Sequence, residues 1–210
     1  MYELSTMVDV IIRQEKLKFR QEFILEKVIK LIINQGIDDF SMADVCRETG
    51  LGAAQIYRCF KDKNTMLEHL IMEITHKRIR KFLLHQCDFN HTAEQLATTK
   101  IDNLNDDELK LITEFLRLNR NSELHRLVVM ADELLMNCGL ELIHQRFKNT
   151  TLNEQRAISE AIATLTEGML IRTYKGLNHQ ADPEMMQRIY QAFFNSLDNL
   201  FTYHSNGDNG

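Results

Sequence analysis

Residues that could contact nucleic acid cluster between positions 53 and 63. Gln55 carries an amide that could hydrogen-bond a base edge, with adenine as its natural partner. Two alanines precede it, and such small side chains let a backbone approach the bases. A phenol, a guanidinium and two ammonium groups follow it, and these groups typically contact phosphates. The cluster therefore predicts a surface that reads bases and binds phosphates, built from Ala53, Ala54, Gln55, Tyr57, Arg58, Lys61 and Lys63.

Two short helices joined by a tight turn would hold this cluster, within the stretch SMADVCRETGLGAAQIYRCFKDK. Ser41 and Asp44 form a capping signature, which predicts a first helix over about 42–49. Gly50 then stands where the end of a helix favours a left-handed residue. A second helix over about 53–60 would bury apolar residues spaced four apart, Ile56 and Phe60. This is the spacing of a helix-turn-helix, whose second helix enters a DNA major groove.

The segment from about Arg20 to Leu70 resembles the N-terminal domain of the TetR family of bacterial repressors. Its most specific part is the run Ile-Tyr-x-x-Phe-x-x-Lys. The matching residues are Ile24-Leu25, Gly36, Ser41-Met42, Val45, Gly50-Leu51, Ile56-Tyr57, Phe60, Lys63 and Leu67. Three positions depart from the family pattern: Thr49 replaces the usual Ala, Gly52 the usual capping Ser, and Ala54 a frequent Gly. These departures concern the choice of operator more than the fold.

The resemblance implies a DNA-binding head at residues 1–66 and a helical effector-binding and dimerisation body at 67–210. It implies a homodimeric repressor that binds a palindromic operator on double-stranded DNA and releases it when a small-molecule effector binds. The residues expected to contact DNA are Arg20, Ser41, Met42, Gly52, Ala53, Ala54, Gln55, Tyr57, Arg58, Lys61 and Lys63.

The whole chain of 210 residues is predicted to be all-α, with about nine helices. It contains 1 Pro, and no convincing strand alternation is present. The first helix would carry a buried stripe of Phe23, Val28, Leu31 and Ile32 and end at Gly36. A linking helix over about 64–84 precedes five body helices, near 92–99, 106–119, 122–149, 153–176 and 183–203. No apolar run is long enough to span a membrane, and the first twelve residues do not form a secretory signal.

The charge is unevenly distributed. The net charge of −5 argues against nucleic acid, but basic residues outnumber acidic ones over 13–81 and acidic residues prevail from 82 onwards. A basic head on an acidic body fits DNA binding. The basic residues just before the head (Arg13, Lys16, Lys18, Arg20) allow two interpretations. They form an arm that touches phosphates or the minor groove, or they extend the first helix into solvent.

Two surfaces of the body follow from the resemblance. An effector cavity among the body helices would be lined by flexible or aromatic side chains, although the same residues would equally pack a helical core. The candidates are Phe82, Phe115, Met130, Met136, Met169 and Tyr174. A dimer interface would pair the last two helices across a two-fold axis. Its candidates are Ile162, Leu165, Met169, Met186, Ile189, Phe193 and Leu197.

Enzymatic chemistry finds little support. The sequence shows no nucleophile–base pairing, phosphate loop or Cys/His cluster, so we expect neither an enzyme nor a cofactor nor a metal site. His69, Glu73 and His76 share a helix face, but it is polar and favours solvated side chains. The four cysteines lack a C-x-x-C pair, which fits reduced thiols in the cytoplasm. The alternative function is a helical small-molecule-binding protein or enzyme whose head no longer reads DNA, an interpretation that Gly52 and Ala54 leave open.

Overall fold

The computed structural model describes residues 2–100, 104–120, 122–177 and 181–202, with residues 2–10 described as backbone only. Within these ranges the chain is all-helical, as predicted, and forms nine helices. They are α1 (Tyr2–Gln35), α2 (Met42–Thr49), α3 (Ala53–Cys59), α4 (Lys63–His85), α5 (Phe89–Thr98), α6 (Asp106–Leu116), α7 (Glu123–Arg146), α8 (Leu152–Tyr174) and α9 (Pro183–Thr202). No helix of this described part is long and apolar enough to cross a membrane.

The N-terminal basic residues belong to one continuous helix. α1 runs without a break from Tyr2 to Gln35, and its residues 11–20 are exposed to solvent. The structure therefore agrees with the second interpretation, in which these residues extend the first helix. Gly36 ends the helix with a positive φ of 94°. Phe23 was predicted to be buried, and this is wrong: it is exposed, because it lies about 100° around the helix from Ile24, which begins the buried stripe.

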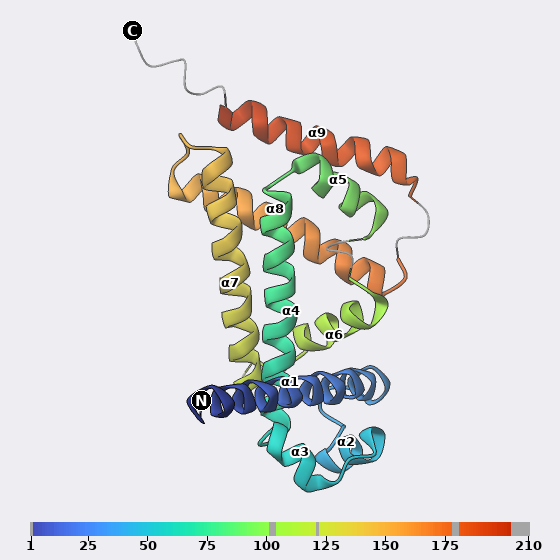
Figure 1. Ribbon diagram of the computed structural model, residues 1–210. Helices are drawn as coiled ribbons and strands as arrows, with labels where there is room; N and C mark the ends of the chain where they lie inside the picture. Colours follow the sequence, from blue (N-terminus) through green and yellow to red (C-terminus); the bar gives the residue numbers. More distant parts are fainter. Residues whose placement is uncertain (1, 101–103, 121, 178–180, 203–210) are drawn as a thin grey trace.

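The helix-turn-helix packs beneath α1 at one end of the molecule (Figure 1). The core there buries the two residues that were predicted for the second helix, Ile56 and Phe60, and Val45 of α2. It continues upward into the foot of the body, where Leu111 and Phe115 of α6 join the same cluster. The predicted boundary at 66/67 falls inside α4, which belongs to both parts.

The body surrounds a second core. Figure 1 shows α4 and α7 side by side, with α9 lying over α5 and α8 passing behind. Its buried residues come from α5, α7, α8 and α9, with three aromatic rings at the centre, Phe89, Phe147 and Phe194. α9 begins as predicted: Pro183 is its first residue, and the Asp182 carboxylate accepts a hydrogen bond from the Glu184 N–H at 3.1 Å.

Candidate nucleic-acid interface and ligand cavity

The turn that presents α3 is built from local interactions. The Ser41 hydroxyl and the Asp44 carboxylate cap each other's backbone N–H groups, which completes the predicted capping box at the start of α2. The hydrogen bonds from Ser41 hold the pKa of Asp44 below its usual range. Gly50 ends α2 with a φ of 69°, in the left-handed region that favours glycine. Gly52, with a φ of −67°, then caps α3 without a side-chain oxygen.

The outer face of α3 is open to solvent. Ala53, Ala54, Tyr57 and Arg58 are all exposed, and Lys61 is exposed just after the helix. Tyr57 in particular keeps 54% of its surface accessible despite its size. Buried residues of the same helix, Ile56 and Cys59, face the core instead. The structure therefore leaves all five of these predicted contact residues accessible to solvent.

Gln55 has a partner in the isolated chain. Its amide oxygen accepts a hydrogen bond from the Gly52 N–H at 3.1 Å, which is the half of a capping box that the third helical residue supplies. A bidentate contact with adenine uses the amide oxygen and nitrogen together. Gln55 must therefore leave Gly52 before it can read a base in that way.

α1 holds the far end of α3 through a residue that the sequence did not reveal. Gln21 Nε2 donates to the Cys59 carbonyl at 3.1 Å, across 38 positions of sequence. Arg20, the preceding residue, is exposed. Burial raises the pKa of the Cys59 thiol, while the charges of Arg20 and Arg58 lower it, which places both guanidinium groups near the end of α3. No sequence motif connects Gln21 with Cys59, because the contact depends on how two helices cross.

Lys63, which was predicted to contact a phosphate, has partners within the chain. Its ammonium group donates to the carbonyls of Asp38 and Phe40, at 2.9 and 2.8 Å, and lies 4.2 Å from the centre of the Phe40 ring. Burial lowers its pKa, and the nearby charges of Asp38 and Asp39 raise it. In this conformation Lys63 secures the loop between α1 and α2, so we assign it a positioning role. Met42, also predicted at the interface, is half-buried against the first core.

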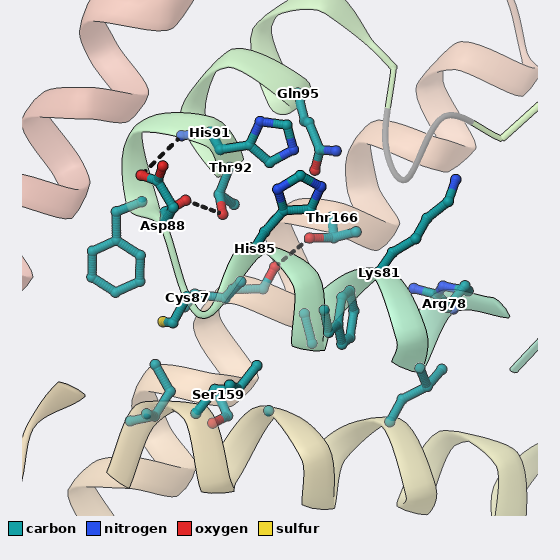
Figure 2. A pocket seen from close by; sticks show the side chains of 18 of the residues that line it. Arg78, Lys81, His85, Cys87, Asp88, His91, Thr92, Gln95, Ser159 and Thr166 are labelled. Carbon is teal, nitrogen blue, oxygen red and sulfur yellow. Dashed lines mark hydrogen bonds between the residues drawn. The ribbon is translucent and has the colours of Figure 1, made fainter. Parts of the chain in front are cut away.

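A cavity of about 170 Å³ lies within the body, between α4, α5, α7 and α8. Figure 2 shows polar side chains gathered along one side of it, including His85, His91, Gln95 and Lys81. The imidazoles of His85 and His91 stack, with ring centres 3.8 Å apart. Apolar side chains of α7 and α8, such as Leu142 and Ile162, line the rest. This combination of an apolar body with a few polar groups is typical of small-molecule sites.

Of the residues predicted to bind an effector, the structure places Phe82 and Met136 on the cavity wall and the other four elsewhere. Phe115 is buried in the first core and Met169 in the second. Met130 is exposed on α7, and Tyr174 is exposed near the end of α8. The cavity's polar residues were missed, because they come from separate helices and form no sequence pattern.

Acidic side chains also border this cavity. Asp132 and Glu167 line it together with Arg78. Burial raises the pKa of Glu167, the charge of Asp132 raises it further, and Arg78 lowers it. The guanidinium of Arg78 is therefore partly balanced by these carboxylates.

The last two helices leave part of their apolar surface uncovered. Ile189, predicted at the dimer interface, is 55% exposed, and Met185 and Leu200 lie on the same face of α9. Of the remaining predicted interface residues, Met186 is half-buried, and five are buried in or packed against the second core: Ile162, Leu165, Met169, Phe193 and Leu197. On α8, Gly168 is exposed, with no atom within 4 Å of the place where a Cβ would stand.

Metal-ligating side chains do not cluster within the described ranges. No group of three His, Cys, Asp or Glu side chains there could hold a metal ion. His69, which shares a predicted face with Glu73 and His76, makes an edge contact with the Phe60 ring at 5.3 Å. The cysteines at 46, 59, 87 and 138 are free thiols, and burial raises the pKa of Cys87 to about 11.

Comparison with known proteins supports the interpretation of the head. Residues 24–70 match the family model described as bacterial regulatory proteins, tetR family. No curated protein sequence matches the chain.

Solved structures share the fold over most of the chain. A transcriptional regulator from Pseudomonas aeruginosa PAO1 superposes with a TM-score of 0.71 at 13% identity, over 87% of this chain and 91% of that one. A TetR-family regulator from Mesorhizobium loti superposes with a TM-score of 0.66 at 12% identity, over 88% of this chain and 97% of that one. FadR from Bacillus subtilis, in complex with stearoyl-CoA, superposes with a TM-score of 0.63 at 13% identity, over 82% of this chain and 96% of that one.

Proposed function

We propose that this chain, whose residues 24–70 match the tetR family of bacterial regulatory proteins, is a homodimeric transcriptional repressor that a small molecule releases from its operator. One observation carries the DNA-binding part: the outer face of α3 presents Tyr57, Arg58 and Lys61 to solvent beside two alanines. These groups suit phosphate contacts, which fix a protein's register on the duplex. The alanines let the helix approach the base edges.

Specificity for the base sequence of the operator would come from the start of α3. Gln55 exchanges its hydrogen bond with Gly52 for a base edge as the helix enters the major groove. A helix of 7 residues reads only a few base pairs. Two heads, one helical turn apart on a palindrome, would supply the remaining specificity.

The dimer would form through α8 and α9. An exposed apolar strip on α9, defined by Met185, Ile189 and Leu200, supports this assignment, because water contact with such a strip is unfavourable. Gly168, in the C-terminal third of α8, also supports this assignment. Glycine costs about 1 kcal/mol relative to alanine within a helix, and no contact inside the chain requires it. A glycine at this position would let the α8 helix of a second copy approach closely.

The effector would act through α4. Its first residue, Lys63, holds the loop that precedes the helix-turn-helix, and its last two turns carry Arg78, Lys81 and His85 on the cavity wall. A ligand that shifts this end of the helix would therefore change the position of the helix-turn-helix relative to the body. The FadR structure with stearoyl-CoA supports a small-molecule effector for this fold by analogy.

Binding-site selection from genomic DNA tests the proposal. Recovery of one inverted repeat is expected, with affinity that falls steeply as salt rises. Arg58→Ala and Lys61→Ala should weaken binding to all sequences, because both act on the backbone. Random recovery, with affinity unchanged in both variants, would instead favour a ligand-binding protein whose head no longer reads DNA.

A further inference from the structure

Within the described ranges, two buried side-chain polar atoms have no hydrogen-bond partner, and both lie in the cavity wall. They are Ser159 Oγ on α8 and His91 Nε2 on α5. Ser159 is 7% exposed, so its hydroxyl cannot turn to bulk water. A buried polar group without a partner costs about 1–3 kcal/mol. Such a cost is expected where a ligand or bound water completes the hydrogen bonding.

The two atoms lie on different sides of the cavity. Figure 2 shows the His91 ring beside that of His85 at one side and Ser159 at the other. Apolar side chains such as Leu142 and Ile162 line the same cavity. A single polar head group therefore does not serve both. A ligand with two separate hydrogen-bonding groups and an apolar middle fits this layout.

The two ends differ in charge. On the His91 side, Lys81 lines the cavity between Arg78 and His85 along α4. Asp88 lines it too, but its carboxylate accepts hydrogen bonds from the backbone N–H groups of Asn90 and His91 as the cap of α5. Arg78 is partly balanced by Asp132 and Glu167, whereas Lys81 is an additional cation. At the Ser159 end, Ile162 and Ala163, the lining residues of α8 within about one helix turn of Ser159, are uncharged. An anionic oxygen suits the imidazole end, and a neutral hydroxyl suits Ser159.

The size of the cavity limits the middle of the ligand. Its volume of about 170 Å³ exceeds that of an engineered 150 Å³ cavity that holds benzene. One aromatic ring therefore fits, and Phe82, Phe89 and Met136 on the wall suit contact with such a ring.

We infer that the cavity binds a small aromatic acid that carries a second, neutral hydroxyl at its far end, with the carboxylate at His91 and Lys81 and the hydroxyl at Ser159. This inference rests on the proposed function for the role of the ligand as an effector. It concerns binding alone, so the binding itself is measured on the free protein.

Calorimetry with three acids of increasing length provides the test: para-hydroxybenzoate, para-hydroxyphenylacetate and para-hydroxyphenylpropanoate. At least one should bind about five- to tenfold more tightly than its para-methyl counterpart, in which a methyl group replaces the hydroxyl, as expected for one hydrogen bond. para-Cresol, which lacks the carboxylate, should bind less tightly than the best acid. para-Hydroxybenzylamine, which places a cation at the imidazole end, should bind least.

Two variants assign each end. Ser159→Ala should reduce the hydroxyl-over-methyl preference to within about twofold, and Ser159→Cys should retain part of it. His91→Phe keeps a ring against His85 and should weaken the acids about five- to tenfold while leaving para-cresol unchanged. Met136→Leu, a volume-conserving change on the same wall, is the matched control and should preserve both preferences.

Thermal unfolding of the ligand-free protein separates binding from structure. Ser159→Ala should unfold at the same or a higher temperature, because it removes a buried hydroxyl without a partner. A lower unfolding temperature would mean that the hydroxyl has a structural role, and this would overturn the inference.

Other results would also overturn it: no acid binds at millimolar concentration, the amine binds best, or Ser159→Ala keeps the hydroxyl preference. DNA retardation by the same preparation distinguishes the two proposals. DNA binding without acid binding removes this inference alone, and acid binding without DNA binding removes the proposed function.

Discussion

The Lys63 ammonium lies 2.8 Å from the carbonyl oxygen of Phe40 and 4.2 Å from the centre of its ring. It thereby joins the first residue of α4 to the loop that precedes the helix-turn-helix. Lys63→Met keeps the apolar stem but leaves the carbonyls of residues 38 and 40 without this donor. We expect the free energy of unfolding to fall by about 1–2 kcal/mol, and DNA affinity to fall for every sequence. Urea unfolding followed by helical circular dichroism measures the first effect.

Lys61→Met is the matched control for that experiment. Lys61 is exposed and makes no hydrogen bond or ion pair within the described ranges, so its removal should leave stability within about 0.5 kcal/mol. Its DNA affinity should nevertheless fall, with the slope of log affinity against log salt reduced by about 1. Equal stability of the two variants would contradict the positioning role of Lys63.

Gln55 and Gly52 offer a test of base reading. Gln55→Ala removes both the amide that would read a base and the acceptor for the Gly52 N–H. We expect altered preference among operator variants, measured by competition binding with base-substituted duplexes. Gly52→Ser should stabilise the protein by a few tenths of a kcal/mol, because serine supplies a capping oxygen. If Gln55→Ala lowers affinity equally for all duplexes, Gln55 supports the helix and reads no base.

Local signals in the sequence predicted the helix-turn-helix well. The Ser41 and Asp44 cap, the left-handed Gly50 and the start of α9 at Pro183 each depend on neighbours within a few residues. Such short-range chemistry is readable without knowing the fold. The segment of about fifty residues that resembled a known family is also the segment that the family model matches.

Long-range packing could not be read in this way. Lys63 meets a carbonyl 23 positions earlier in the sequence, a contact that its residue type and its place at the start of a helix do not reveal. Met130 was a reasonable cavity candidate by type, but the rotation of α7 places it at the surface. His91 and Ser159 share a cavity because α5 and α8 pack around it. The two residues are 68 positions apart in the sequence and form no recognisable motif.

Arg146 joins three parts of the body. It makes two hydrogen bonds to the Asp198 carboxylate of α9, at 2.9 and 2.7 Å, and one to the Cys87 carbonyl at 3.3 Å. Its guanidinium also lies 4.3 Å from the centre of the Phe89 ring. The hydrogen bonds that Arg146 donates to Asp198 raise the pKa of Arg146 despite its partial burial. The bidentate geometry makes this pair stronger than an ordinary surface pair.

Arg146→Met should therefore lower the free energy of unfolding by about 1–2 kcal/mol. Arg117→Met is the matched control, because Arg117 pairs with Glu114 on the same helix turn and is largely exposed. It should cost at most about 0.5 kcal/mol. Equal losses in denaturant unfolding would show that the bidentate geometry of Arg146 adds nothing.

Asp62 should make stability depend on pH. Its carboxylate accepts hydrogen bonds from the backbone N–H and the hydroxyl of Thr65, both at 2.8 Å, and these hold its pKa below the usual 3.8. A folded-state pKa below the unfolded one means that the stabilisation is complete above about pH 4 and is lost as pH falls through the folded-state value. Asp62→Asn should therefore lower the unfolding temperature at pH 7 and flatten its decrease in acid. An unchanged acid slope would show that Asp62 contributes no pH-dependent cap.

Ile189 tests the dimer. It is 55% exposed on the apolar strip of α9, and a carboxylate there would have to be buried against a second copy. Ile189→Glu should therefore be monomeric by light scattering at concentrations where the parent chain is dimeric, with unchanged helical circular dichroism. Leu84→Glu makes the same kind of change at a residue of α4 that is 77% exposed and should remain dimeric. Because the operator is expected to be read by two heads, the monomeric variant should also lose affinity for an inverted repeat while keeping that for a single half-site. A dimeric Ile189→Glu protein would move the interface away from this strip.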